Sequence, residues 1–75
     1  MNENQNIKRP NYIISKYVLM QDDKFTFNDV LKNVENEIKS QFKIRDEMEE
    51  YILNILEKMC ELDIIKRTNN YYFPI

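Results

Sequence analysis

The sequence predicts a small α+β domain in which three helices are followed by a C-terminal two-stranded β-hairpin. Three segments repeat their apolar residues at helical spacing, and two β-branched or aromatic runs follow them, separated by Asn69-Asn70. The chain contains no glycine, so backbone positions that require a positive φ fall to Asn or Asp. The turn candidates Asp22-Asp23, Asp63 and Asn69-Asn70 divide the chain at the same points as the periodicity does.

The first predicted helix follows Pro10, which marks the start of a domain that spans residues 10–75. Residues 1–9 are polar and aperiodic, and we expect them to form a disordered N-terminal arm. The apolar residues after Pro10 share one helical face: Ile13, Ile14, Tyr17, Val18 and Met20.

The second predicted helix has a clear start at Thr26. Thr26 is a suitable N-cap with Asp29 three residues later, and Phe25 and Val30 have the spacing of a hydrophobic staple. Lys24 and Phe25 are expected to add a very short strand before the helix. Its buried face is predicted to carry Phe27, Val30, Leu31, Val34 and Ile38.

The third predicted helix follows a connector, residues 39–45, in which Phe42 and Ile44 alternate with charged residues. Asp46 is the expected N-cap, because Glu49 three residues later completes a capping box. This helix has the strongest helical pattern in the chain, formed by Met48, Tyr51, Ile52, Ile55, Leu56, Met59 and Leu62.

The hairpin is predicted from residues 64–68 and 71–73, with Asn69-Asn70 forming a type I′ turn. A two-residue loop pairs Thr68 with Tyr71, Arg67 with Tyr72 and Lys66 with Phe73. We expect Arg67 to lie along an aromatic ring, and Pro74 to end the pairing.

The element order helix, short strand, helix, helix, hairpin resembles the winged-helix (winged helix-turn-helix) family over residues 11–75. The segments FTFNDVLK, LEKMCELDIIKR and NNYYFPI carry the resemblance, with Asp63 at a turn where the family often has glycine. The resemblance implies duplex DNA binding, with the third helix in the major groove and the hairpin as the wing. It is typical of small regulatory or accessory proteins of a bacterial chromosome, plasmid or phage.

The charge distribution favours a different use of this fold. Residues 46–63 carry seven acids and one lysine, a local charge of −6, within a chain whose net charge is −2. DNA binding depends on neutralising phosphates, so the outer face of the third helix is unsuited to a groove. That face holds Asp46, Glu47, Glu50, Asn54, Glu57, Lys58 and Glu61.

We therefore expect any DNA contact to come from the basic periphery of the domain. The connector offers Lys39, Ser40, Gln41, Lys43 and Arg45, and the resemblance places them on the same side as the wing. The wing offers Lys66, Arg67, Asn69 and Asn70. Lys8 and Arg9 on the arm are expected to reach a neighbouring groove.

The alternative is a winged-helix module for protein–protein interaction or dimerisation that does not bind DNA. A basic protein partner would then meet the acidic face of the third helix. Apolar residues beyond the needs of a three-helix core suggest a homodimer contact, namely Leu53, Cys60, Tyr12, Ile13 and Ile14.

Other function classes lack the residues that they need. The chain has no histidine, one cysteine and no Gly-rich phosphate loop, so we expect no enzymatic activity, no metal site and no cofactor. The lone Cys60 favours a reduced, cytoplasmic setting, and no apolar run is long enough to indicate secretion or a membrane span.

Overall fold

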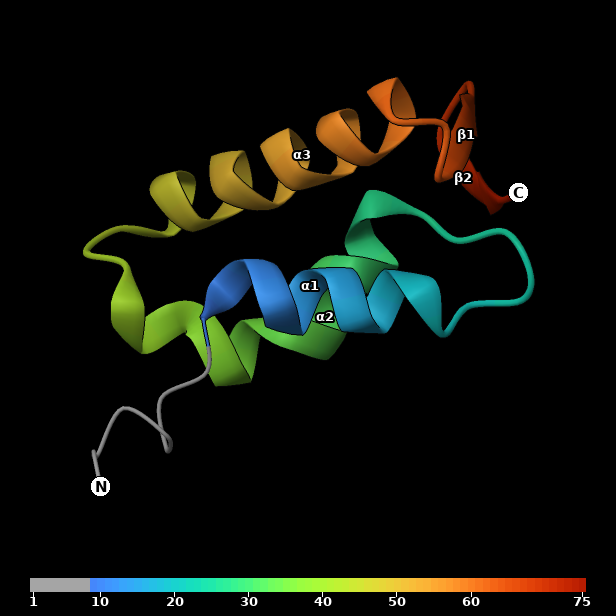
Figure 1. Ribbon diagram of the computed structural model, residues 1–75. Helices are drawn as coiled ribbons and strands as arrows, with labels where there is room; N and C mark the ends of the chain where they lie inside the picture. Colours follow the sequence, from blue (N-terminus) through green and yellow to red (C-terminus); the bar gives the residue numbers. More distant parts are fainter. Residues whose placement is uncertain (1–8) are drawn as a thin grey trace.

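The computed structural model describes residues 9–75 and has the predicted α+β architecture of three helices followed by an antiparallel hairpin (Figure 1). Its elements are α1 (Pro10–Leu19), α2 (Phe27–Ile38), the 3-10 turn η2 (Lys39–Gln41), α3 (Arg45–Glu61), β1 (Ile65–Thr68) and β2 (Tyr71–Pro74). The N-terminal arm expected at residues 1–9 lies outside the described residues, except for Arg9.

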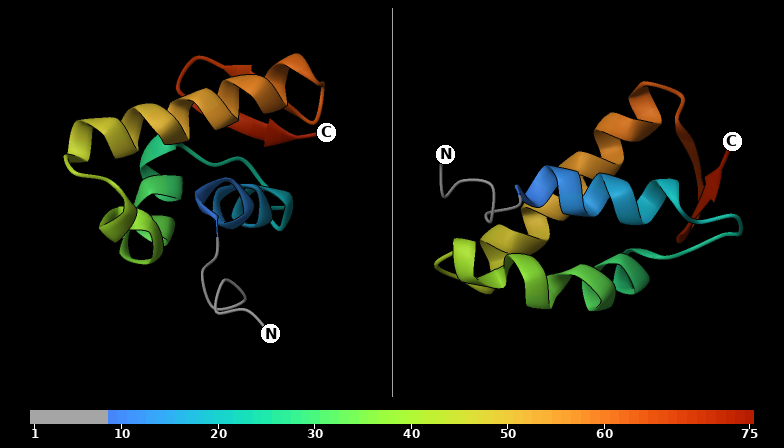
Figure 2. Two further views of the ribbon diagram at one scale, coloured as in Figure 1. Left: turned by 60° about the vertical axis from the view of Figure 1, so that its left-hand side comes forward. Right: turned by 60° about the horizontal axis from the view of Figure 1, so that its bottom comes forward.

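The helices α1 and α2 pack side by side, α3 lies across them, and the hairpin follows the C-terminal end of α3 (Figures 1 and 2). The core between these layers is apolar, and no polar or charged residue in the described part of the chain is buried. The most deeply buried residues come from all three helices and from the loop before α2: Ile14, Val18, Phe25, Val30, Val34, Ile38, Met48, Ile52 and Leu56.

The start of α2 confirms the capping prediction. The Asp29 backbone N–H donates to Thr26 Oγ1 at 3.1 Å, and the Thr26 N–H donates to Asp29 Oδ2 at 3.0 Å. Phe25 and Val30, the two residues of the predicted staple, are both buried. These reciprocal bonds satisfy backbone donors that the first helical turn would otherwise leave free.

The start of α3 differs from the prediction. Ile44, not Asp46, occupies the N-cap position, and no side chain caps the helix. Because Arg45 is already helical, its side chain reaches Glu49 one turn later. Asp46 lies instead in the first turn, where its charge is favourable near the positive end of the helix. The predicted connector is correspondingly shorter, since η2 continues directly from α2.

The end of α3 confirms Asp63 as a turn residue, because its φ is 60°. The Ile64 N–H donates to the Met59 carbonyl at 2.9 Å, and the Asp63 N–H donates to the Cys60 carbonyl at 3.0 Å. This pair of bonds is a Schellman motif, in which a left-handed residue stops the helix and redirects the chain into β1.

The hairpin has the predicted register, and β1 pairs with β2 through Lys66–Phe73, Arg67–Tyr72 and Thr68–Tyr71. Pairing continues to Ile65–Pro74, contrary to prediction. In an antiparallel ladder, hydrogen-bonded residue pairs alternate with non-hydrogen-bonded ones. Ile65 and Pro74 form a non-hydrogen-bonded pair, so the missing N–H of proline costs no hydrogen bond.

Two further details of the hairpin differ from the sequence prediction. Only Asn69 has a positive φ, 54°, whereas a type I′ turn needs two, so the turn is not of type I′. The expected short strand at Lys24 and Phe25 is an isolated bridge, in which Phe25 and Tyr72 exchange two backbone hydrogen bonds. The sheet therefore has two strands instead of three.

The distribution of apolar residues also departs from prediction at the ends of the helices. Of the residues expected to extend a homodimer contact, Ile13 and Ile14 are buried, whereas Tyr12 and Leu53 are 53% and 40% exposed. Leu62 and Met20 lie beyond the last residues of α3 and α1 and are 62% and 70% exposed. Within residues 9–75, no helix combines the length and the apolar character needed to span a membrane.

Candidate nucleic-acid interface

The hairpin presents the most concentrated set of predicted site residues. Lys66, Arg67, Asn69 and Asn70 are all exposed, and residues 64–75 contain no acid. Side chains alternate across the ladder, so Lys66 shares the outer face with Phe73, while Arg67 shares the inner face with buried Tyr72. The two cations thus lie on opposite faces of the same thin element.

Lys24 lies beside the exposed cations of the hairpin, although it was not among the site residues predicted from the sequence. Its Nζ lies over the Tyr71 ring, 4.7 Å from the ring centroid. The bridge between Phe25 and Tyr72 places Lys24 beside the hairpin. The short strand expected at Lys24 and Phe25 was the sequence feature that could have identified Lys24 as a site residue. Lys24 therefore lies over a hairpin ring, while Arg67 pairs with Tyr72 and hydrogen-bonds to its side chain. We call Lys24, Lys66, Arg67, Asn69 and Asn70 the wing surface.

The inner side of the hairpin forms a groove of about 390 Å³ against the start of α2 and the middle of α3. The residues that line it are Arg67, Asn69, Asn70 and Tyr72 of the hairpin, Thr26, Phe27 and Asn28 at the start of α2, and Leu53 of α3. Burial raises the pKa of Tyr72, and the nearby Arg67 charge opposes this rise. The pKa of Cys60 is likewise raised by burial and lowered by Arg67, so the thiol stays protonated near neutral pH.

The connector residues are also exposed, but Arg45 already has acidic partners. Its Nη1 lies 3.0 Å from Glu35 Oε1, and its Nε lies 2.9 Å from Glu49 Oε2. Hydrogen bonds to these two carboxylates raise the pKa of Arg45. Lys39, Ser40, Gln41 and Lys43 lie close by and line the same end of the molecule.

The structure does not bring the connector and the wing surface together. The hairpin turn lies beside Leu53, which is about 12 Å along the α3 axis from Arg45. Asp46, Glu50, Leu53 and Glu57 follow each other at intervals of three or four residues, so they form one stripe along α3. A ligand that followed α3 from the connector to the wing would therefore pass exposed carboxylates.

The outer face of α3 is as acidic as the sequence predicts. Asp46, Glu47, Glu50, Glu57 and Glu61 are all exposed. Lys58 lies on this face and approaches Glu61 only to 3.9 Å, at an exposed position where an ion pair contributes little. We call these five acids the acidic face.

The remaining predicted site residues lie at the other end of the chain. Arg9 is exposed, and its carbonyl accepts a hydrogen bond from the Ile13 N–H. Lys8 lies outside the described residues. Within residues 9–75, no three His, Cys, Asp or Glu side chains gather closely enough to hold a metal ion.

Comparison of the chain with protein-family models, with curated proteins and with solved structures gave no match.

Proposed function

We propose that this chain is a winged-helix DNA-binding protein of the regulatory or accessory kind, which contacts duplex DNA through its wing surface. The observation that carries the proposal is the exposed, acid-free hairpin with Lys66 and Arg67, beside which Lys24 adds a third cation. The three-helix and hairpin order supports the winged-helix assignment, with the third strand reduced to one bridge. The cytoplasm is the proposed setting.

The electrostatics of α3 restrict how such a protein would approach DNA. Its acidic face would meet phosphates at a cost, because binding gains free energy mainly when cations displace condensed counterions. The proposed orientation therefore turns the hairpin toward the duplex and the acidic face away from it. Asn69 and Asn70 at the turn supply amide donors and acceptors for the backbone or for base edges.

The connector has a lesser role in this proposal. Glu35 and Glu49 neutralise the charge of Arg45. Lys39 and Lys43 are then the connector's remaining exposed positive charges. The acidic stripe of α3 separates these lysines from the wing surface. We expect one duplex to engage the wing surface alone.

The experiment measures the affinity for duplex DNA as a function of salt for two matched double variants. Lys66→Gln/Arg67→Gln and Lys39→Gln/Lys43→Gln each remove two exposed positive charges and leave the same net charge. For the wild type, a plot of the logarithm of the binding constant against the logarithm of the salt concentration should have a slope of about −3 per wing, because three phosphates are contacted. The wing variant should lower the slope magnitude by about 2, and the connector variant should leave it nearly unchanged.

Two outcomes would overturn the proposal. A salt slope near zero in the wild type would remove duplex DNA as the ligand. Equal losses in the two double variants would show that general positive charge, and not the hairpin, determines binding. Far-ultraviolet circular dichroism of each variant checks that the fold is retained.

A second function is favoured by the acidic face itself. It has five exposed carboxylates, which complement a basic protein surface. Capture of a basic protein by the wild type, lost in Glu50→Lys but retained in Lys66→Gln/Arg67→Gln, would favour this function over DNA binding.

A further inference from the structure

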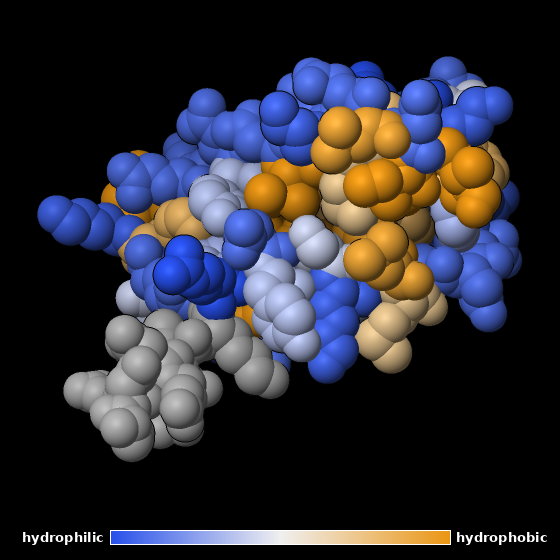
Figure 3. All heavy atoms as spheres, viewed as in Figure 1, coloured by the Kyte–Doolittle hydropathy of each residue, from blue (hydrophilic) through white to orange (hydrophobic). Residues whose placement is uncertain are grey.

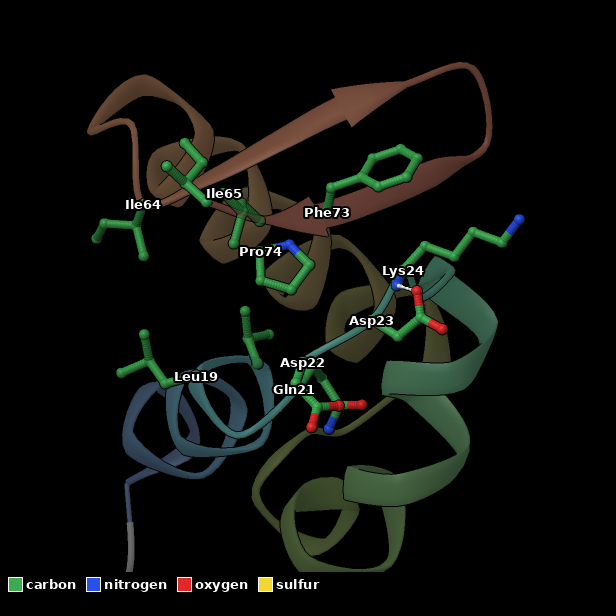
Figure 4. Close-up of a pocket in the computed structure, with 11 residues that line it drawn as sticks. Leu19, Gln21, Asp22, Asp23, Lys24, Ile64, Ile65, Phe73 and Pro74 are labelled. Atoms are coloured by element: carbon green, nitrogen blue, oxygen red, sulfur yellow. Dashed lines mark hydrogen bonds between the residues drawn. The ribbon is translucent and has the colours of Figure 1, made fainter.

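A groove of about 580 Å³ lies at the end of the molecule where α1 stops and the hairpin begins. Leu19 of α1 lies on one wall, and Ile64, Ile65 and Pro74 of the hairpin lie on the wall that faces it (Figure 4). Asp22 and Asp23 border the groove from the loop between α1 and α2. Of the wing surface, only Lys24 lines this groove, and its side chain points away from the apolar walls (Figure 4). Lys66 borders the groove, because it pairs across the hairpin with Phe73, which lines it.

Exposed apolar side chains gather around the groove. Leu19 is 65% exposed, Ile64 38% and Ile75 73%, and all three line it. Leu62, 62% exposed, lies two residues before Ile64, and Met20, 70% exposed, follows Leu19 but lines a second groove between α1 and α2. Figure 3 shows the hydrophobic surface concentrated over the C-terminal ends of α1 and α3. The other exposed large apolar residues within residues 9–75 are Tyr12, Ile44, Leu53 and Tyr71.

The size of this patch suits a protein interface. Leu19, Ile64, Ile75 and the nearby Leu62 present on the order of 400 Å² of apolar surface. The largest apolar patch on a typical monomer is about 300–600 Å², and a standard interface buries about 800 Å² per partner. With its polar rim, the patch reaches the area that a small stable dimer requires.

Shape and charge together indicate which partner fits. A two-fold interface must complement itself, so it needs both protruding and recessed parts and both signs of charge. Here exposed Leu19 and Ile75 project beside the groove that they line. Asp22 and Asp23 provide the acids on the loop side. Lys66, two residues after Ile64, provides a base on the hairpin side.

We propose that this groove binds a second copy of the chain in a two-fold symmetric dimer. The loop of each copy, with Asp22 and Asp23, lies against the hairpin base of the other copy, with Lys66. The apolar side chains of both copies fill the space between. The Asn69-Asn70 turns stay at the far ends of the two hairpins. The inference shares Lys66 with the proposed DNA contact, but its tests contain no DNA, so either proposal can fail without the other.

The first test compares one substitution at two exposed isoleucines. Ile75→Glu introduces a charge into the patch, whereas Ile44→Glu does so at the opposite end of α3, where Ile44 is 55% exposed. Sedimentation equilibrium of the full chain, from micromolar to submillimolar concentration, gives the dimer dissociation constant. We expect a wild-type dimer that Ile75→Glu weakens about 100-fold, because each dimer contains the change twice, and that Ile44→Glu leaves intact.

The second test uses charge reversal to establish the two-fold arrangement. Asp22→Lys/Asp23→Lys alone places like charges opposite Lys66, and Lys66→Glu alone places like charges opposite Asp22 and Asp23. Both variants should dimerise more weakly than the wild type. When they are mixed, both halves of the interface regain opposite charges, so a heterodimer should form.

A wild type that stays monomeric over this range would overturn the proposal and leave the groove to a different protein. Equal weakening by Ile75→Glu and Ile44→Glu would place the interface elsewhere. A mixture that fails to form the heterodimer would contradict the pairing of the loop with the hairpin. Circular dichroism spectra matching the wild type exclude unfolding as the cause of any of these results.

Discussion

The helix α3 and the hairpin are neighbours in the chain and pack against each other, yet they differ in what they bury and what they expose. α3 buries Met48, Ile52, Leu56 and Met59 along one face and carries acids on the other. The hairpin buries only Ile65 and Tyr72 and exposes cations and amides. The helix therefore stabilises the core, while the hairpin is available for contact.

The largest expected effect distinguishes the two faces of α3. Ile52 has no exposed surface and Leu53, the next residue, is 40% exposed. Ile52→Ala should lower the free energy of unfolding by about 2–5 kcal/mol, because it leaves a cavity in the core. Leu53→Ala should cost less than about 1 kcal/mol. Urea denaturation measures both, and similar losses would contradict the assignment of α3 as the buried scaffold.

A smaller effect distinguishes two adjacent residues of the hairpin turn. Asn69 has a φ of 54°, whereas Asn70 is not among the residues with positive φ. Asn69→Gly should raise the free energy of unfolding by up to about 1 kcal/mol, because glycine adopts this conformation without steric cost. Asn70→Gly should lower it by about 0.5–1 kcal/mol through the greater entropy of the unfolded chain. Thermal denaturation of the two variants tests the turn, and the opposite order would show that its positive φ lies at Asn70.

The smallest effect concerns the way in which the hairpin is anchored. Burial holds the pKa of Tyr72 above its ordinary value of 10.0, so the folded protein keeps this proton more tightly than the unfolded chain. The stabilisation that comes from this proton is fully present below pH 10.0, the ordinary pKa of tyrosine. It is lost as the pH rises from there through the pKa of Tyr72 in the folded protein.

Tyr72→Phe should therefore lose less stability than the wild type between neutral and strongly alkaline pH. The pKa of Tyr17 is raised by burial as well, so part of the loss should remain in the variant. Urea denaturation at matched pH values measures the difference. An identical alkaline loss in the two proteins would show that Tyr72 is not a source of the pH dependence.

The sequence predicted those parts of the fold that depend on local chemistry. The capping box of Thr26 and Asp29, the left-handed Asp63 and the hairpin register each follow from a few neighbouring residues. The predicted start of α3 was wrong, and the observed start places Arg45 in a contact across the fold. Arg45 bridges to Glu35 on α2, which no pattern of neighbouring residues indicates.

The candidate surfaces were predictable to a lesser degree. The exposed wing residues and the acidic face follow from alternation and helical spacing. Two features required the tertiary arrangement, namely Lys24 over the Tyr71 ring and the apolar groove between α1 and the hairpin. Leu62 belongs by spacing to the buried stripe of α3, but the helix ends before it and the side chain reaches the surface.

The most direct test of the contact surface is a titration of the protein with short duplex DNA, followed residue by residue through backbone amide chemical shifts. We expect the shifts to concentrate in residues 64–73 and at Lys24, and the amides of Asp46, Glu50 and Glu57 to change little. Shifts centred on the outer face of α3, or on residues 39–45, would contradict this expectation.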